Sequence, residues 1–103
     1  MNKPLPVEVS DLAAAQIRAA ETWWRLNRPK APNAIREDLE RASSFIAVQP
    51  QAGARARNAN LPGVRRLLLA RTRYHLYYRQ IEAPKRMEVL AFWHASRGSN
   101  PPI

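Results

Sequence analysis

Residues 64–94 read VRRLLLARTRYHLYYRQIEAPKRMEVLAFWH, and this stretch decides the fold. Three runs within it are rich in the branched and aromatic residues that favour strands: 64–69, 74–80 and 87–94. The connections between them are short, because they comprise only residues 70–73 and residues 81–86. Connections of this length join antiparallel neighbours, so we predict a three-stranded antiparallel unit over about 64–94.

Alternation along the middle run places two sets of side chains on opposite faces of the sheet. One set contains Leu76 and Tyr78, which we expect to face the core. The other set lies on the opposite face, which we expect to be open, and comprises His75, Tyr77 and Arg79. The last run is apolar on both faces, so alternation does not decide which of its faces is buried.

Two amphipathic helices are predicted before these strands. In the first, apolar residues recur at the spacing of one helix face: Ala13, Ile17, Ala20 and Trp24. The second repeats the same spacing: Ile35, Leu39, Ala42 and Ile46. Ser10 and Asn33 are the expected N-caps, and Pro50 closes the second helix. Because only a proline-containing connector at 29–32 separates the helices, we predict an antiparallel helical hairpin over about 10–49.

The remaining segments complete the layout. Residues 5–9 alternate like a short strand, and Pro6 limits that strand to a sheet edge or to a start after the proline. Residues 51–63 are polar and predict a loop, and residues 95–103 predict an irregular tail. We therefore expect a single α+β domain over 1–103, in the order β-α-α-β-β-β, with an antiparallel sheet covered on one face by the helical hairpin.

The basic residues are concentrated in the second half of the chain. The formal net charge is +9, and 14 of the 17 basic residues are arginines. Residues 1–49 contain seven basic and six acidic residues, whereas residues 50–103 contain ten basic and two acidic ones. Since arginine suits bidentate recognition of phosphate and carboxylate, this distribution predicts an anionic partner, either a nucleic acid or an acidic protein. A surface that is basic only for solubility is the alternative.

Several classes of protein are excluded by composition. The absence of cysteine removes disulfides, cysteine-bound metals and thiol nucleophiles, and two histidines are too few for a His-rich metal site. No phosphate-binding loop or Ser-His-Asp pattern is present, so we expect no cofactor and no metal. No apolar run approaches the roughly 18 residues of a membrane span, and residues 1–9 lack a signal-peptide core. We therefore expect a soluble, cytoplasmic protein.

An open sheet face with Arg, Tyr and His side chains can bind RNA, because tyrosines stack on bases and arginines contact phosphates. With a competent acid and base, the same face could drive a ribose 2′-hydroxyl onto the adjacent phosphate. His94 is a candidate proton shuttle. The alternative is an ordinary solvated face of an antiparallel sheet.

The chain resembles the RelE/ParE superfamily of toxins from bacterial type II toxin–antitoxin pairs. The resemblance runs from about Val7 to Pro102 and is carried by VEVS, AAETWWRLNRPKAP, DLERASSFIAVQPQAG, GVRRLLLARTRYHLYYR and VLAFWHASRG, in that order. No single segment is diagnostic, but their order and spacing are fairly specific. The fold of this superfamily agrees with the layout predicted above.

The resemblance implies one of two activities. RelE-like members cleave mRNA at the ribosome without a metal, and here the corresponding residues would be Arg71, Arg73, His75, Tyr77, Arg79, His94 and Arg97. ParE-like members inhibit DNA gyrase, and the residues that contact the target would be Arg71, Arg73, Tyr77, Arg79, His94 and Arg97. Ala95 interrupts the C-terminal basic cluster and no tyrosine follows Gly98, so the ParE-like branch is favoured and an enzyme is the alternative.

The resemblance also implies a protein partner, an acidic ParD-like antitoxin that neutralises the toxin by direct binding. Its amphipathic segment would fold on the toxin, bury apolar surface and meet arginines. The helical hairpin and the sheet edge are the expected docking area, with candidate contacts at Trp23, Trp24, Leu67 and Leu69.

Overall fold

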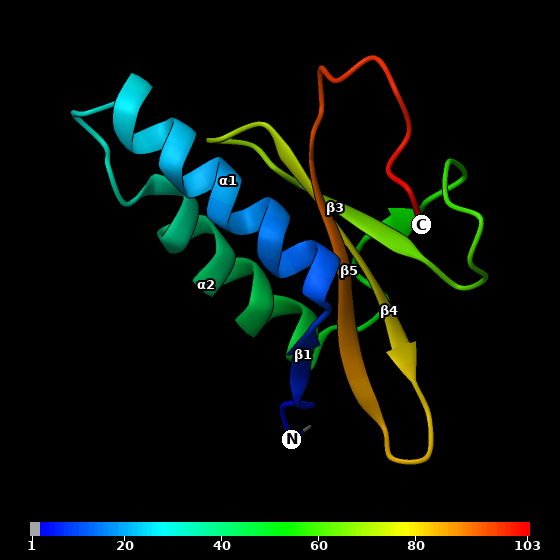
Figure 1. The fold of residues 1–103 in the computed structure, drawn as a ribbon. Helices are drawn as coiled ribbons and strands as arrows, with labels where there is room; N and C mark the ends of the chain where they lie inside the picture. Colours follow the sequence, from blue (N-terminus) through cyan, green and yellow to red (C-terminus); the bar gives the residue numbers. More distant parts are fainter. Residues whose placement is uncertain (1–2) are drawn as a thin grey trace.

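The structure, a computed structural model, describes residues 3–103, so the first two residues of the predicted domain lie outside it. Two helices lie side by side on one face of a five-stranded sheet (Figure 1). The elements are β1 (Val7–Val9), α1 (Asp11–Asn27), α2 (Ala34–Val48), β2 (Ala54–Arg55), β3 (Arg65–Leu69), β4 (Tyr74–Ile81) and β5 (Arg86–His94). The predicted α+β class, with a helical hairpin on one face of the sheet, is confirmed.

The strand order is β1-β5-β4-β3-β2, and β4 is the central strand. The strands from β2 to β5 pair antiparallel with their neighbours, as predicted for the three long ones. In contrast, β1 pairs with β5 in parallel, so the sheet is mixed rather than antiparallel throughout. Parallel neighbours need a long connection, and here the chain between β1 and β5 runs through both helices and the strands β2, β3 and β4. The two-residue strand β2 lies inside the predicted loop.

The helix boundaries follow from their caps. The Ser10 hydroxyl accepts a hydrogen bond from the Ala13 amide at 3.1 Å, which confirms the predicted cap of α1. Asn33 occupies the N-cap position of α2, but its side chain makes no capping hydrogen bond.

The apolar stripes of the two helices pack on the sheet. They form the main core with residues of β3, β4 and β5, including Ala13, Ala20, Ile35, Ala42, Ile46, Leu76, Tyr78 and Phe92.

A bulge in β5 explains why both faces of this strand are apolar. Tyr77 lies opposite Ala91 whereas Tyr78 lies opposite Val89, so Leu90 is an extra residue in β5. The alternation therefore shifts by one at this point. As a result, the residues of β5 that join the core under the helices are Met87, Val89 and Phe92. Leu90 and Ala91 belong to a second core on the other face.

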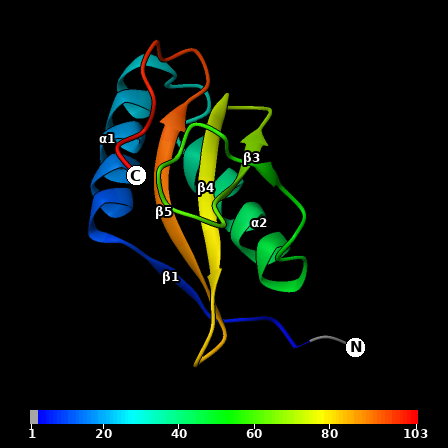
Figure 2. The ribbon, with the colours of Figure 1, turned by 90° about the vertical axis from the view of Figure 1, so that its right-hand side faces the viewer.

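The second core lies on the sheet face that is turned away from the helices. It is formed by Val64, Tyr77, Leu90 and Ala91, with Ala56, Ala59, Trp93 and Ile103 packed against them. In Figure 2 the loop before β3 and the C-terminal segment cross in front of the sheet, with the helices behind it. The Asn60 amide donates to the Ile103 carbonyl at 2.6 Å, which ties the loop to the C-terminal segment. No helix within residues 3–103 combines the length and apolar character needed to cross a membrane.

Candidate functional site

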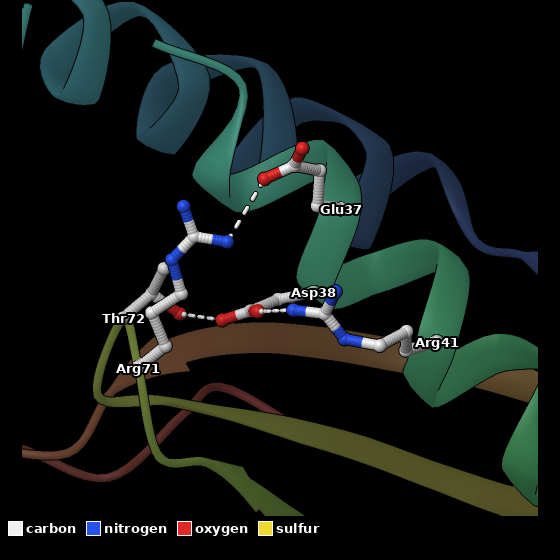
Figure 3. Close-up of polar contacts among 5 residues, drawn as sticks. All are labelled: Glu37, Asp38, Arg41, Arg71 and Thr72. Carbon is white, nitrogen blue, oxygen red and sulfur yellow. Dashed lines mark hydrogen bonds and ion pairs between the residues drawn. The ribbon is translucent and has the colours of Figure 1, made fainter. Parts of the chain in front are cut away.

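The β3–β4 turn, residues 70–73, carries the first two basic residues of the predicted site and is anchored to α2 (Figure 3). The Thr72 hydroxyl is buried and donates to Oδ2 of Asp38 at 2.9 Å. The other oxygen of Asp38 accepts a hydrogen bond from Arg41 at 2.7 Å. Asp38 is only 6% exposed, so its carboxylate is a buried group with partners on both oxygens. This pair of contacts fixes the turn against the helical hairpin.

The two arginines of this turn have different environments. Arg71 donates to Oε1 of Glu37 at 2.8 Å, as Figure 3 shows, so its charge is paired. Arg73 is exposed and has a φ of 66°, a left-handed conformation that costs a non-glycine residue roughly 1–2 kcal/mol. Its amide donates to the Leu69 carbonyl at 2.8 Å, and its own carbonyl accepts from the Ala95 amide at 2.8 Å. Arg73 therefore closes the hairpin and holds the segment that follows β5.

His75 lies beside two arginines on the face turned away from the helices. Its partner in the β4–β5 register is Trp93, and Arg97 stacks over Trp93 with its guanidinium carbon 3.9 Å from the ring centroid. Partial burial lowers the pKa of His75, and the charges of Arg66 and Arg73 lower it further. Both effects favour the neutral form of His75. We call Arg66, Arg73, His75 and Arg97 the basic patch.

Two other residues predicted on this face, Tyr77 and Arg79, are not free to contact a partner. Tyr77 is on the predicted face but is only 1% exposed, because the second core covers it, and its hydroxyl accepts from Asn58 at 2.9 Å. The expectation of an open face is therefore wrong at Tyr77. Arg79 lies opposite Glu88 in the register and donates to its carboxylate at 3.0 Å. Arg79 is thus paired, and it lies near the opposite end of β4 from the basic patch.

His94 lies on the helix side of the sheet. Its ring meets the Tyr74 ring edge-on at 4.9 Å between centroids. The Ser96 amide donates to Nδ1 at 3.2 Å, so in the neutral ring the proton is on Nε2. The two histidines are therefore on opposite faces, since His75 pairs with Trp93 and His94 pairs with Tyr74. The residues predicted for RNA cleavage do not form one cluster.

The residues predicted to contact an antitoxin differ in exposure. Trp23 is 47% exposed on α1, whereas Leu69 is buried and Trp24 is half-buried against the main core. Leu67 is half-buried and lines a groove of about 360 Å³ between α2 and β3. The prediction missed two exposed residues of this groove, Phe45 and Leu68. The sequence does mark both residues. Phe45 lies beside the apolar stripe of α2, and Leu68 alternates with Leu67 and Leu69, so it points to the opposite face of the strand.

Two arginines line this groove, and the sheet edge beside it is partly unpaired. Arg41 and Arg71 belong to its lining, together with a single carboxylate, Asp38, which is already hydrogen-bonded. Within residues 3–103, β2 pairs only with the first two residues of β3, so no strand covers Leu67–Leu69 at this edge. An apolar groove beside an unpaired strand suits an amphipathic segment.

A second basic hollow lies under the loop that precedes β3. Its volume is about 830 Å³, and four arginines line it: Arg55, Arg57, Arg65 and Arg79. Arg65 donates to the Gly53 carbonyl at 2.7 Å, so it also holds β2 in place. Among residues 3–103, no group of three or more His, Asp or Glu side chains is arranged to hold a metal.

Comparison with known proteins agrees with this fold. Residues 7–98 match the family described as "ParE toxin of type II toxin-antitoxin system, parDE". A solved structure titled "Chromosomal ParDE TA system from P. aeruginosa" contains a chain with the same fold, at a TM-score of 0.71 and 22% identity. The similarity covers 89% of this chain and 97% of that one. No curated protein matches the sequence. Since the family match spans nearly the whole chain, this protein belongs to the ParE toxin family of type II toxin–antitoxin systems.

Proposed function

We propose that this toxin arrests growth by inhibiting DNA gyrase, and that an acidic ParD-like antitoxin neutralises it by direct binding. Membership of the ParE family supports the toxin role. The observation that carries the choice of target is the separation of the two histidines on opposite faces of the sheet. Acid–base cleavage of RNA needs its groups within reach of one substrate, and this arrangement favours a binding protein over a ribonuclease.

The proposed contact surface for the target is the basic patch. Arg73 and Arg97 are exposed, and in the part of the chain that the structure describes neither makes an ion pair. Arg71 and Arg79, which were predicted for the same role, are already bonded to Glu37 and Glu88. His94 and the buried Tyr77 lie outside the patch. A patch of unpaired guanidinium groups suits carboxylates or phosphates of a large anionic partner.

The proposed antitoxin site is the groove between α2 and β3. Its apolar residues Phe45, Leu67 and Leu68 would bury the apolar face of an amphipathic segment. Arg41 and Arg71 also line the groove, but each is already paired, with Asp38 and Glu37 respectively, so burial of apolar surface carries this part of the proposal. Trp23 is the other exposed apolar candidate, on α1. Of the other two predicted contacts, Leu69 is buried but also lines the groove, whereas Trp24 packs against the main core.

A supercoiling assay tests both parts of the proposal. Purified toxin in molar excess is expected to stop gyrase from supercoiling relaxed plasmid, and added antitoxin is expected to restore the reaction. Combining Arg73→Gly with Arg97→Ala should raise the toxin concentration needed by about tenfold or more, because two charged contacts are lost. Arg18→Ala, which removes an exposed arginine of α1, is the matched control and should change nothing.

The same assay examines the groove. Phe45→Ser should raise the antitoxin concentration needed for recovery by about tenfold, since a half-exposed anchor is lost. Leu12→Ser is the control, because Leu12 is similarly exposed, 41% against 46% for Phe45, but lies outside the groove. Unchanged supercoiling at excess toxin would contradict the proposal. Cleavage of mRNA in a translation reaction that contains the toxin would show that the protein is a ribonuclease instead.

A further inference from the structure

A pocket of about 580 Å³ lies where the second half of α1 meets the ends of β4 and β5. It shares no lining residue with the groove between α2 and β3 or with the hollow under the loop, but it shares Arg97 with the basic patch. The residues that give it chemical character are Trp23, Arg28, Tyr74, His94, Ser96 and Arg97. Its volume is in the usual range for small-molecule sites, about 300–1,000 Å³.

The walls of this pocket are aromatic. Trp23 presents nearly half of its surface to solvent from α1. On the sheet side, Tyr74 is held flat against Phe92, with ring centroids 4.4 Å apart and planes within 2° of parallel. The His94 ring stands edge-on to Tyr74. The Tyr74 ring is therefore fixed by packing, and the exposed Trp23 ring is accessible, so the two offer surfaces on which a planar ligand can stack.

The charges around the pocket have one sign. Its lining contains the two guanidinium groups of Arg28 and Arg97 and no carboxylate. Each guanidinium lies over a tryptophan ring, Arg28 at 5.4 Å from Trp23 and Arg97 at 3.9 Å from Trp93. Arg28 also donates one N–H to the Asn27 carbonyl at 3.0 Å. A guanidinium over a ring keeps its remaining in-plane N–H groups available to donate, which is the geometry that phosphate recognition uses.

His94 adds a directional donor. The Ser96 amide donates to Nδ1, so the neutral ring carries its proton on Nε2, the other nitrogen. The pocket therefore offers aromatic surfaces, two cations and a ring N–H within one cavity. We infer that this pocket binds a nucleotide, with the base between Trp23 and the Tyr74–His94 pair and the phosphate on Arg28 and Arg97.

Calorimetric titration of the purified toxin with nucleoside 5′-monophosphates tests the inference. We expect one site per chain and saturation by at least one of the four common monophosphates. The matching nucleoside should bind about tenfold or more weakly, because it lacks the charge-assisted hydrogen bonds. Inorganic phosphate should also bind more weakly, since it cannot stack. A short single-stranded oligonucleotide distinguishes the source, because tighter binding than the monophosphate would assign the site to a nucleotide of a strand.

Variants assign the binding to this pocket. Trp23→Ala should weaken binding at least about fivefold, the usual effect of removing a stacking side chain, and Trp23→Phe should restore most of it. Arg28→Ala should weaken monophosphate binding about tenfold and leave nucleoside binding nearly unchanged. Arg25→Ala is the matched control, because Arg25 is on the same helix but outside the pocket. Circular dichroism confirms that each variant is folded. Absence of binding by all four monophosphates, or binding that Trp23→Ala and Arg28→Ala leave unchanged, would overturn the inference.

Discussion

At the scale of single residues, Arg73 combines a backbone role with an electrostatic one. Its left-handed backbone closes the β3–β4 hairpin, and its charge lowers the pKa of His75. These two effects can be separated, because glycine adopts the left-handed conformation without strain and carries no charge. Arg73→Gly therefore keeps the turn while it removes the cation.

For this variant we predict that the pKa of His75 rises but stays below 6.5, because burial, the larger cause, remains. A histidine whose pKa is lowered in the folded state contributes stability above pH 6.5, and that contribution is lost as the pH falls below 6.5. The loss between pH 7 and pH 5.5 should be smaller in Arg73→Gly than in the parent protein. An NMR titration of His75, together with urea unfolding at both pH values, measures the two effects, and a pKa that does not move would contradict the assigned charge effect.

The surroundings of His75 and its neighbours in β4 could be predicted in part from the alternation of residue types. Alternation placed Leu76 and Tyr78 in the main core, and both are fully buried. It also placed His75 and Tyr77 on the same face, but it could not show that residues distant in sequence cover Tyr77. The left-handed conformation of Arg73 could not be predicted from the sequence, because arginine has no preference for that region of φ and ψ.

At the scale of secondary structure elements, the short strand β2 depends on Gly53. The Gly53 amide donates to the Tyr78 hydroxyl at 2.7 Å, and its carbonyl accepts from Arg65 at the same distance. A Cβ atom at this position would lie 2.5 Å from the Arg66 carbonyl oxygen and closer still to the Tyr78 hydroxyl. The backbone there has no room for a side chain.

We predict that Gly53→Ala destabilises the protein by about 1–3 kcal/mol, the usual cost of overpacking. Urea unfolding measures the change in the free energy of unfolding. Gly98→Ala is the matched control, because a Cβ at Gly98 meets nothing within 4 Å and its φ is not positive. Equal stability of the two variants would show that β2 is not held by this close approach.

The elements that could be predicted from sequence were the long, periodic ones. The helices and the strands β3, β4 and β5 each have enough residues to show a period. β2 has two residues and no apolar pattern, so it gave no signal. The parallel pairing of β1 depends on the path of the chain through both helices, and the bulge at Leu90 depends on packing against two cores. Neither is a local property.

At the scale of the whole molecule, the sheet is covered on both faces by different means. The helices cover one face, and irregular segments held by few hydrogen bonds cover part of the other. Net charge alone suggested an anionic partner. The structure divides the arginines of the second half, except Arg86, among the basic patch, the apolar groove and the hollow under the loop. The candidate site could not be assembled from sequence, because these surfaces join residues from distant segments.

The C-terminal segment is expected to contribute to global stability. Ile103 packs on the second core, so Ile103→Ser should lower the free energy of unfolding by about 1 kcal/mol, less than for a fully buried isoleucine. Pro102→Ser is the control, because Pro102 is exposed. Thermal unfolding monitored by circular dichroism compares the two variants. An equal midpoint would mean that the second core does not need this residue.

The double coverage of β4 has a consequence for how the toxin can be switched off. Consecutive residues of this strand, Tyr77 and Tyr78, are buried in opposite cores. We therefore expect their amides to exchange with solvent only when the protein opens as a whole. A partner cannot rearrange such a centre without unfolding the chain. Neutralisation is therefore expected to leave the amide exchange pattern of β4 intact and to act by occluding the surface.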